Sequence, residues 1–227
     1  GACVAHGVVI QSFDKITVAD GSQLSYEAAT SHSVTVRVTD AGGLTYDETF
    51  TVNLTDVNEA TPTITSNRGG ATASIRINEH SAIVTTVTAT DGDSRQTLAY
   101  SISGGADASK FTIDNSTGAL RFVTAPNYEA PTDSGANNVY DVAVQVSDSN
   151  GGIDTQAIAV TVSNVNEAPT DLSLSANTVA ENAANGTVVG TVTGTDVDAG
   201  DSKSYTFTNS AGGRFAINRT TGVITVA

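Results

Sequence analysis

The stretch Asp148–Thr170, D-S-N-G-G-I-D-T-Q-A-I-A-V-T-V-S-N-V-N-E-A-P-T, decides the fold of this chain. It runs from an acidic turn through an alternating segment into a linker of Asn, Glu and Pro. An earlier copy lies at Asp40–Pro62, D-A-G-G-L-T-Y-D-E-T-F-T-V-N-L-T-D-V-N-E-A-T-P. Asp148 follows Asp40 by 108 positions (148 − 40). A period of that size is a whole domain rather than a solenoid coil, so a tandem array of domains is predicted.

Short strands with one buried face are the main local signal. In residues 140–147, Tyr140, Val142, Val144 and Val146 alternate with smaller or polar residues, the period of a strand. Between positions 62 and 168, strands are predicted over 73–77, 83–90, 98–103, 111–113, 120–123, 140–147 and 156–163. Short strands separated by turns predict an all-β fold of two packed sheets. No helix is predicted.

The repeat divides the chain into three predicted parts: the C-terminal part of a repeat over 1–61, a complete repeat over 62–168, and the N-terminal part of a repeat over 169–227. The segment 215–226 matches 111–122 in spacing, after which the last two strands of a repeat are absent. The sequence starts with Gly and has no signal peptide, so we expect a processed product or an excerpt.

Composition excludes several classes of function. The net charge of −14 argues against nucleic acid, whose phosphates need basic partners. The same charge would repel itself in a compact chain unless cations neutralise it; a merely acidic surface is the plainer alternative. No stretch of 18 apolar residues exists, so no membrane insertion is expected. The single Cys3 excludes an intramolecular disulfide and is interpreted as a spare thiol.

Acidic motifs recur in the same order in successive repeats: a Glu before the second strand, two Asp at its end, a Tyr-Glu after the fifth strand, an Asp after the sixth, and an acidic linker. A single such turn is usually satisfied by its own backbone. Oxygen ligands alone are what a calcium site of six to eight ligands requires, so Ca²⁺ is predicted. The candidate ligands are Glu27, Asp40, Asp56, Asn58, Glu59, Glu79, Asp91, Asp93, Glu129, Asp148, Asn164, Asn166, Glu167, Glu181, Asp196 and Asp198.

This order of motifs resembles the cadherin repeat, in the cadherin-like form common in large bacterial surface proteins. The resemblance covers nearly the whole chain and implies tandem seven-stranded, immunoglobulin-like Greek-key β-sandwiches with calcium between consecutive repeats, the first and last repeats being incomplete. It implies a first junction of Glu27, Asp56, Asn58, Glu59, Asp91, Asp93 and Asp148, with the carbonyls of Val57 and Ala60 as further candidates. It implies a second junction of Glu79, Glu129, Asn164, Asn166, Glu167, Asp196 and Asp198.

The sequence departs from the family pattern at three positions. Ser25 and Asn127 stand where the family usually has Asp before the Tyr-Glu, and Asn164 replaces the first Asp of the second linker. Each lost carboxylate lowers the charge of the site. Fewer or more weakly bound ions are therefore expected at the second junction.

The two ends leave two alternatives open. Asp40 would complete the calcium site of the third part, and Glu181 that of the first, if 170–227 of one chain packed with 1–57 of another. That arrangement would give a head-to-tail filament by strand donation. An excerpt from a longer array is the plainer alternative.

The functional prediction is a calcium-binding, non-enzymatic, structural or adhesive segment at the cell surface or outside the cell. Its predicted partners are repeats of the same or identical chains, with a cell-surface protein or a glycan as a further candidate. The alternatives are the filament subunit and a carbohydrate-binding module, against which the 5% of aromatic residues counts.

Features of catalytic or other metal sites are weak. Cys3, His6 and Ser31–Ser33 have no orienting acid in a recognisable motif. His6, His32 and His80 lack zinc spacing. The loop 196–201 resembles the start of an EF-hand, but Phe207 occupies the position of its last Glu.

Overall fold

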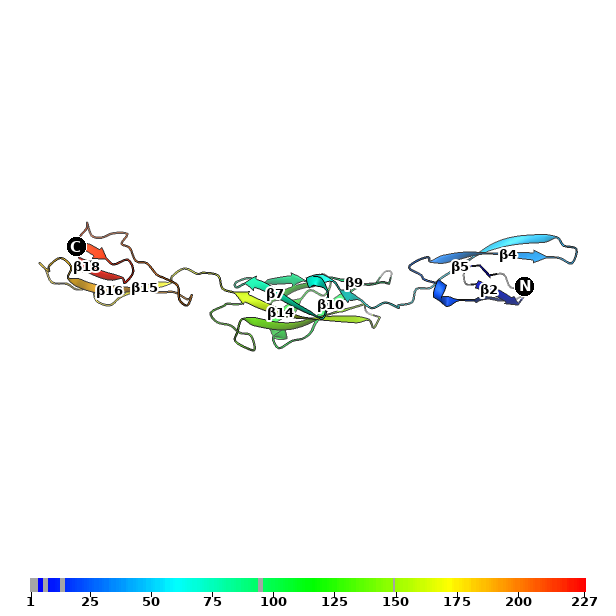
Figure 1. Ribbon diagram of the computed structural model, residues 1–227, viewed down its shortest axis with the longest axis horizontal. Coiled ribbons are helices and arrows are strands. Elements are labelled where there is room, and N and C mark those ends of the chain that lie inside the picture. Colours follow the sequence, from blue (N-terminus) through cyan, green and yellow to red (C-terminus); the bar gives the residue numbers. More distant parts are fainter. Residues whose placement is uncertain (1–3, 6–7, 13–14, 94–95, 149) are drawn as a thin grey trace. The chain divides into compact units, whose positions relative to one another are not determined.

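The computed structural model of the chain describes residues 4–5, 8–12, 15–93, 96–148 and 150–227, drawn in Figure 1. Cys3 and His6 lie outside the described residues. By its contacts the chain divides into two compact units. The first comprises Gly1–Ser74, Val84–Arg121 and Asp141–Ala159; the second comprises Ile75–Ile83, Phe122–Tyr140 and Val160–Ala227.

All regular elements are strands, apart from three single-turn 3₁₀ helices within the described residues, η1 (Gly21–Gln23), η2 (Ser66–Arg68) and η3 (Ala108–Lys110). No helix in these ranges is long and apolar enough to cross a membrane. The strands are β1 (Val4–Ala5), β2 (Val8–Ser12), β3 (Lys15–Val18), β4 (Ser31–Thr39), β5 (Thr45–Asn53), β6 (Thr63–Ile64), β7 (Thr72–Asn78), β8 (Ile83–Thr86), β9 (Ala89–Thr90), β10 (Ala99–Gly104), β11 (Phe111–Ile113), β12 (Ala119–Phe122), β13 (Val139–Ser147), β14 (Ile153–Ser163), β15 (Asp171–Leu174), β16 (Val188–Thr195), β17 (Phe215–Ile217) and β18 (Val223–Val226).

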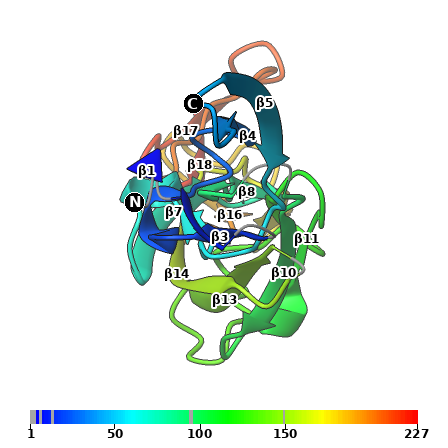
Figure 2. The same cartoon turned by 90° about the vertical axis from the view of Figure 1, so that its right-hand side faces the viewer.

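Two sheets between positions 72 and 163 hold most of the buried apolar side chains. One has the strand order β10-β13-β14-β7 and the other β11-β12-β8, and Figure 2 shows β13 beside β10 and β14. The alternation predicted for β13 is confirmed: Tyr140, Val142, Val144 and Val146 are all buried. Each buried side chain of this kind contributes about 1.5–3 kcal/mol relative to exposure.

The predicted strands of this region are confirmed within a few residues, with two differences. The segment predicted as one strand over 83–90 forms β8 and β9, separated at Val87, whose N–H bonds to the carbonyl of Gly118 instead of continuing the strand. The two-residue β6, which pairs with β9, was not predicted. So short a strand carries too few residues for an alternation signal.

The predicted match between 111–122 and 215–226 reappears in the hydrogen bonding of the two turns. Gly118 N–H donates to the Asp114 carbonyl, and Gly222 N–H donates in the same way to the Asn218 carbonyl. Both glycines have a φ of +70°, and a Cβ would overlap the carbonyl oxygen of Val87 at Gly118 and that of Val192 at Gly222. The repeat therefore extends to the backbone conformation that only Gly adopts easily.

The other strand groups bury less. β4 and β5 form a hairpin in register from Ser31–Asn53 to Thr39–Thr45, and β1-β2-β3 form a small sheet. In the second unit the order is β15-β16-β18-β17. Large apolar side chains are exposed in both groups, such as Tyr46 at 64% and Leu172 at 66%.

Candidate metal centres

The first cluster lies in the first unit and joins a turn, a linker and a strand end. Glu27 follows η1, Glu59 follows β5 and Asp93 follows β9. One carboxylate oxygen of each lies within 4.8 Å of the others. The backbone N–H of Ala60 donates to Asp93 Oδ2 at 2.9 Å, which fixes the linker against the turn. The structure thus brings together acids that the sequence separates by 66 positions (93 − 27).

The pKa of Glu59 is raised by its surroundings in the first cluster. Loss of hydration raises the pKa of Glu59, and the charges of Glu27, Asp93 and Asp56 raise this pKa further. Asp91 lies beside them: its Oδ1 accepts from Asp93 N–H at 2.9 Å, while its buried Oδ2 has no hydrogen-bond partner. Like charges this close are stable together only when a cation or a proton compensates them.

Asp148, by contrast, is already satisfied by the protein. It is 1% exposed and accepts hydrogen bonds from the N–H groups of Asn150 at 2.7 Å and Gly152 at 3.0 Å. Asn58 Nδ2 donates to Asp148 Oδ2 at 3.2 Å. These bonds, that of Asn150 first, lower the pKa of Asp148. Gln96 accepts from the Asn150 side chain and donates to Asn58, both at 2.8 Å, and so ties the two together.

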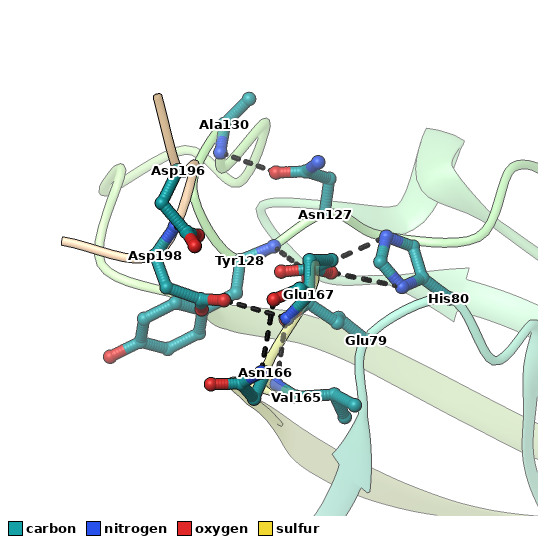
Figure 3. Close-up of polar contacts among 10 residues, drawn as sticks. All are labelled: Glu79, His80, Asn127, Tyr128, Ala130, Val165, Asn166, Glu167, Asp196 and Asp198. Atoms are coloured by element: carbon teal, nitrogen blue, oxygen red, sulfur yellow. Dashed lines mark hydrogen bonds and ion pairs between the residues drawn. The ribbon is translucent and has the colours of Figure 1, made fainter. Parts of the chain in front are cut away.

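The second cluster, drawn in Figure 3, lies in the second unit and is centred on Glu79, directly after β7. Its side chain is fully buried. Glu79 Oε2 accepts from Tyr128 N–H at 2.7 Å, and Oε1 accepts from Val165 N–H at 2.8 Å. Backbone donors from two separate segments therefore hold the carboxylate in one orientation.

Three further carboxylates gather beside Glu79. Glu129, Glu167 and Asp198 each offer an oxygen within 4.8 Å of the others. Glu167 N–H donates to Asp198 Oδ2 at 2.7 Å, and Asp198 N–H donates to Asp196 Oδ1 at 3.1 Å. Glu129 Oε2, both carboxylate oxygens of Glu167 and Asp198 Oδ1 are buried without a hydrogen-bond partner. Buried anionic oxygens without donors are costly unless a cation neutralises them.

The pKa of Glu167 is raised and that of Asp198 is lowered, so the two acids differ in role. Loss of hydration raises the pKa of Glu167, and the charges of Glu79, Asp198 and Glu129 add to this effect. The backbone of Glu167 and the side chain of Asn164 lower the pKa of Asp198 through hydrogen bonds. Asp198 is therefore an anion fixed by the protein, whereas for Glu167 the loss of hydration and the negative neighbours outweigh the compensation from His80.

The predicted ligands whose side chains are exposed to solvent include Asn166, Asp40 and Glu181. Asn166 is exposed, and its side-chain amide donates to the Glu167 carbonyl at 2.9 Å. Asp40 is exposed and caps the β4–β5 turn, accepting from Gly42 and Leu44 N–H at 2.9 and 2.8 Å. Glu181 is exposed. Neither Asp40 nor Glu181 belongs to a carboxylate cluster in the described part of the chain, and their pairing between chains stays a prediction.

Sequence reasoning missed several residues of these clusters. Gln96 and Asn150 carry no motif, and only the fold brings them to Asn58. His80 was set aside for lack of zinc spacing, yet it lies against Glu79 and against Glu167, which is 87 positions away. Asp201 lies with Asp196 and Asp198 in one group of carboxylates. The resemblance of the loop 196–201 to the start of an EF-hand was the one sequence feature that pointed to Asp201 as a possible ligand.

These features define a class of protein: tandem β-sandwich units with acidic clusters at their linkers. Residues 72–165 match the family described as Cadherin domain. The chain is 32% identical over 148 residues to human Protocadherin Fat 1, covering 63% of this chain and 3% of that protein. It is 30% identical over 212 residues to mouse Cadherin EGF LAG seven-pass G-type receptor 2, covering 90% of this chain and 7% of that protein.

Solved structures agree on the fold. Human CDH23 EC21-23 matches with a TM-score of 0.63 at 23% identity, covering 97% of this chain and 71% of that one. The Protocadherin gammaB7 EC3-6 cis-dimer structure matches with a TM-score of 0.61 at 19% identity, covering 100% and 57%. The chain is built of cadherin-like repeats. The domain boundaries at 61 and 168 and the bacterial origin stay predictions.

Proposed function

We propose that this chain is a calcium-binding, non-enzymatic segment of an extracellular or cell-surface adhesion protein, in which Ca²⁺ at the two clusters fixes successive repeats to one another. The observation that carries the proposal is the set of buried, unpartnered oxygens on Glu129, Glu167 and Asp198. Oxygens of this kind need positive charge, and the described residues around them offer one imidazole, that of His80.

The donor set favours calcium over other hard cations. Both clusters bring together carboxylates from several turns beside a linker, and calcium tolerates six to eight oxygen ligands in irregular geometry. Magnesium demands a near-octahedral shell and retains its water. Dissociation constants of about 10⁻⁴–10⁻³ M are expected, the range of extracellular calcium modules.

Binding would act through the linkers. Glu59 and Glu167 stand in the two linkers, and each lies within 4.8 Å of acids from other turns. An ion held by such a set stabilises the arrangement in which all its ligands meet, so binding free energy becomes ordering free energy. The relatives matched here are cadherins, which supports an adhesive role; the chain spans only 3–7% of the two named relatives, so the activity of the whole protein is part of the proposal.

Small-angle scattering of the 227-residue chain with millimolar Ca²⁺ and with chelator tests the proposal. The particle should become more extended and more uniform when calcium is added. The double variant Glu167→Gln, Asp198→Asn should lose most of this response, and the control variant Glu48→Gln, an exposed acid on β5 outside the clusters, should keep it. Identical scattering profiles with and without calcium would refute the mechanism.

A filament subunit is the second candidate, favoured by the exposed apolar residues of two strand groups. Val38 and Tyr46 on the β4–β5 hairpin, and Leu172 and Val188 on β15 and β16, are each about 60% exposed or more. Exposed strands of this kind are templates for pairing with a second chain. Sedimentation velocity over a range of concentrations decides: growing oligomers support the filament, and a strict monomer excludes it. The cis-dimer of the gammaB7 protocadherin is a precedent for contacts between like chains.

A further inference from the structure

His80 is the one imidazole that the described residues place in a carboxylate cluster (Figure 3). It directly follows Glu79 at the end of β7. Its Nε2 lies 3.7 Å from Glu79 Oε2, and its Nδ1 lies 3.4 Å from Glu167 Oε1. One ligand atom from each of the three residues lies within 4.8 Å of the others.

These spacings are longer than hydrogen bonds. A nitrogen that donates to a carboxylate oxygen usually lies about 2.7–3.2 Å from it. Two ligands on one zinc ion, each about 2.0–2.1 Å from the metal in a tetrahedral site, lie roughly 3.3 Å apart. The 3.4 Å separation of His80 Nδ1 and Glu167 Oε1 matches that of two ligands on one metal ion. Nδ1 is the nitrogen that would bind the ion, because Nε2 lies toward Glu79 and each residue offers one ligand atom.

The two carboxylates are prepared for such an ion in different ways. The backbone N–H groups of Tyr128 and Val165 orient Glu79, and each donates to one carboxylate oxygen. Each oxygen keeps a second lone pair that could bind a metal ion. Outer donors of this kind typically hold metal ligands in place. Both oxygens of Glu167 are buried and accept no hydrogen bond.

Asp198 supplies an independent sign that the cluster is built for cations. The residue is 4% exposed, and its buried Oδ1 has no partner. It shares Glu167 with Glu129 on the carboxylate side of the cluster, whereas His80 and Glu79 share Glu167 on the other side. Glu167 thus belongs to two groups of candidate ligands, one with oxygen atoms alone and one that includes an imidazole nitrogen.

We propose that Glu79, His80 and Glu167 form a site for a transition-metal dication of the zinc type, adjacent to the hard-cation site at Glu129, Glu167 and Asp198. Imidazole nitrogen suits zinc, whereas calcium takes oxygen ligands. Three protein ligands leave the fourth tetrahedral position to water or to a group of a partner. This site adds a second metal to the proposed function. It depends on the proposed function only in that the calcium ion would share Glu167 as a ligand.

Calorimetric titration of the full chain with Zn²⁺ and, separately, with Ca²⁺ tests the site. All proteins carry Cys3→Ser, which removes the thiol as a competing ligand. His80→Asn is the test variant: His80 has a φ of +59°, and Asn adopts this left-handed conformation readily. His32→Gln, on β4 and outside the clusters, is the matched control.

His80→Asn should weaken zinc binding by at least about tenfold and leave calcium affinity unchanged within about twofold, while His32→Gln should change neither. In the parent protein, zinc should also shift the ¹⁵N resonances of the His80 imidazole, and calcium should not move them by direct coordination. Equal zinc affinity of parent and His80→Asn, or one-for-one displacement of calcium by zinc, would overturn the site. Absence of calcium binding with zinc binding intact would instead refute the proposed function alone.

Discussion

The two clusters come from the same repeated motifs but differ in how far the protein itself satisfies their acids. Beside the first, Asp148 is surrounded by donors, with Asn58 and Gln96 linking it to the turns nearby, and one buried oxygen, Asp91 Oδ2, has no hydrogen-bond partner. In the second, four carboxylate oxygens of Glu129, Glu167 and Asp198 are buried without a hydrogen-bond partner. The difference teaches that carboxylate count alone does not set the demand for a cation; the donors around each carboxylate decide it.

The amides of the second cluster and its unpartnered oxygens have opposite consequences for calcium affinity. The amides Asn127 and Asn164 predict weaker binding at the second cluster, because they replace charged ligands. The unpartnered oxygens of Glu167 and Asp198 predict that this cluster depends more on its ion. Calcium titration of variants in each cluster distinguishes these two expectations.

Removing calcium should have the largest effect. An ion present at 100 times its dissociation constant stabilises the folded state by about 2.7 kcal/mol for each site that it fills. Thermal unfolding followed by circular dichroism, with millimolar Ca²⁺ and with chelator, should show a clear fall in the midpoint upon chelation. Equal amounts of Mg²⁺ serve as the control and should restore little of it.

Matched substitutions should then rank the clusters. Asp198→Asn in the second cluster and Asp93→Asn in the first each remove one charge from a buried Asp. We expect Asp198→Asn to lower the calcium affinity of its site by roughly tenfold or more, since ligand charge tunes these sites. Asp93→Asn should have a smaller effect, because Asp91 Oδ2 is the unpartnered buried oxygen described at the first cluster, against four at the second. Calcium titration of both variants checks the order, and the reverse order would contradict the argument from unpartnered oxygens.

The pH dependence of the calcium-free chain should follow Glu167. Its pKa is raised above the ordinary value of 4.5, so the folded state binds more protons than the unfolded state as the pH passes upward through this range. The contribution of Glu167 to stability is therefore present below pH 4.5 and is lost as the pH rises through the folded-state pKa. The lowered pKa values of Asp148 and Asp198 act in the opposite sense, since their contribution is lost as the pH falls.

Glu167→Gln isolates this effect. Without calcium at pH 7, the variant should be at least as stable as the parent, because it removes an uncompensated charge. With saturating calcium, it should be less stable than the parent, because it removes a ligand. Chemical denaturation at pH 5 and at pH 7, each with and without calcium, checks this prediction. A variant that is equally destabilised under all four conditions would show that Glu167 has only a packing role.

Gln96→Ala should give the smallest change. It removes the two hydrogen bonds that link Asn58 to Asn150, a loss of about 0.5–1.5 kcal/mol each at most in a partly exposed setting. Calcium affinity should change by less than about threefold, since the Gln96 amide bonds to Asn58 and Asn150 rather than to a carboxylate of the cluster. A larger loss of affinity would identify Gln96 as a direct ligand.

The strands could be predicted because their signal is local. Tyr140, Val142, Val144 and Val146 alternate along one strand, and Gly118 and Gly222 mark equivalent turns. The cadherin-like repeat was recognisable because its acids recur in a fixed order. The contact of His80 with Glu167 and those of Gln96 with Asn58 and Asn150 could not be predicted, because these partners lie 38 to 87 positions away and meet only after the sheets are packed.

A crystal structure of the 227-residue chain grown in millimolar calcium examines both clusters at once. We predict ions within about 2.3–2.6 Å of carboxylate oxygens of Asp198 and Glu167 in the second cluster, and of Asp93 and Glu59 in the first. Density at both places that refines as water, with oxygen–oxygen distances near those of ordinary hydrogen bonds, would contradict the account.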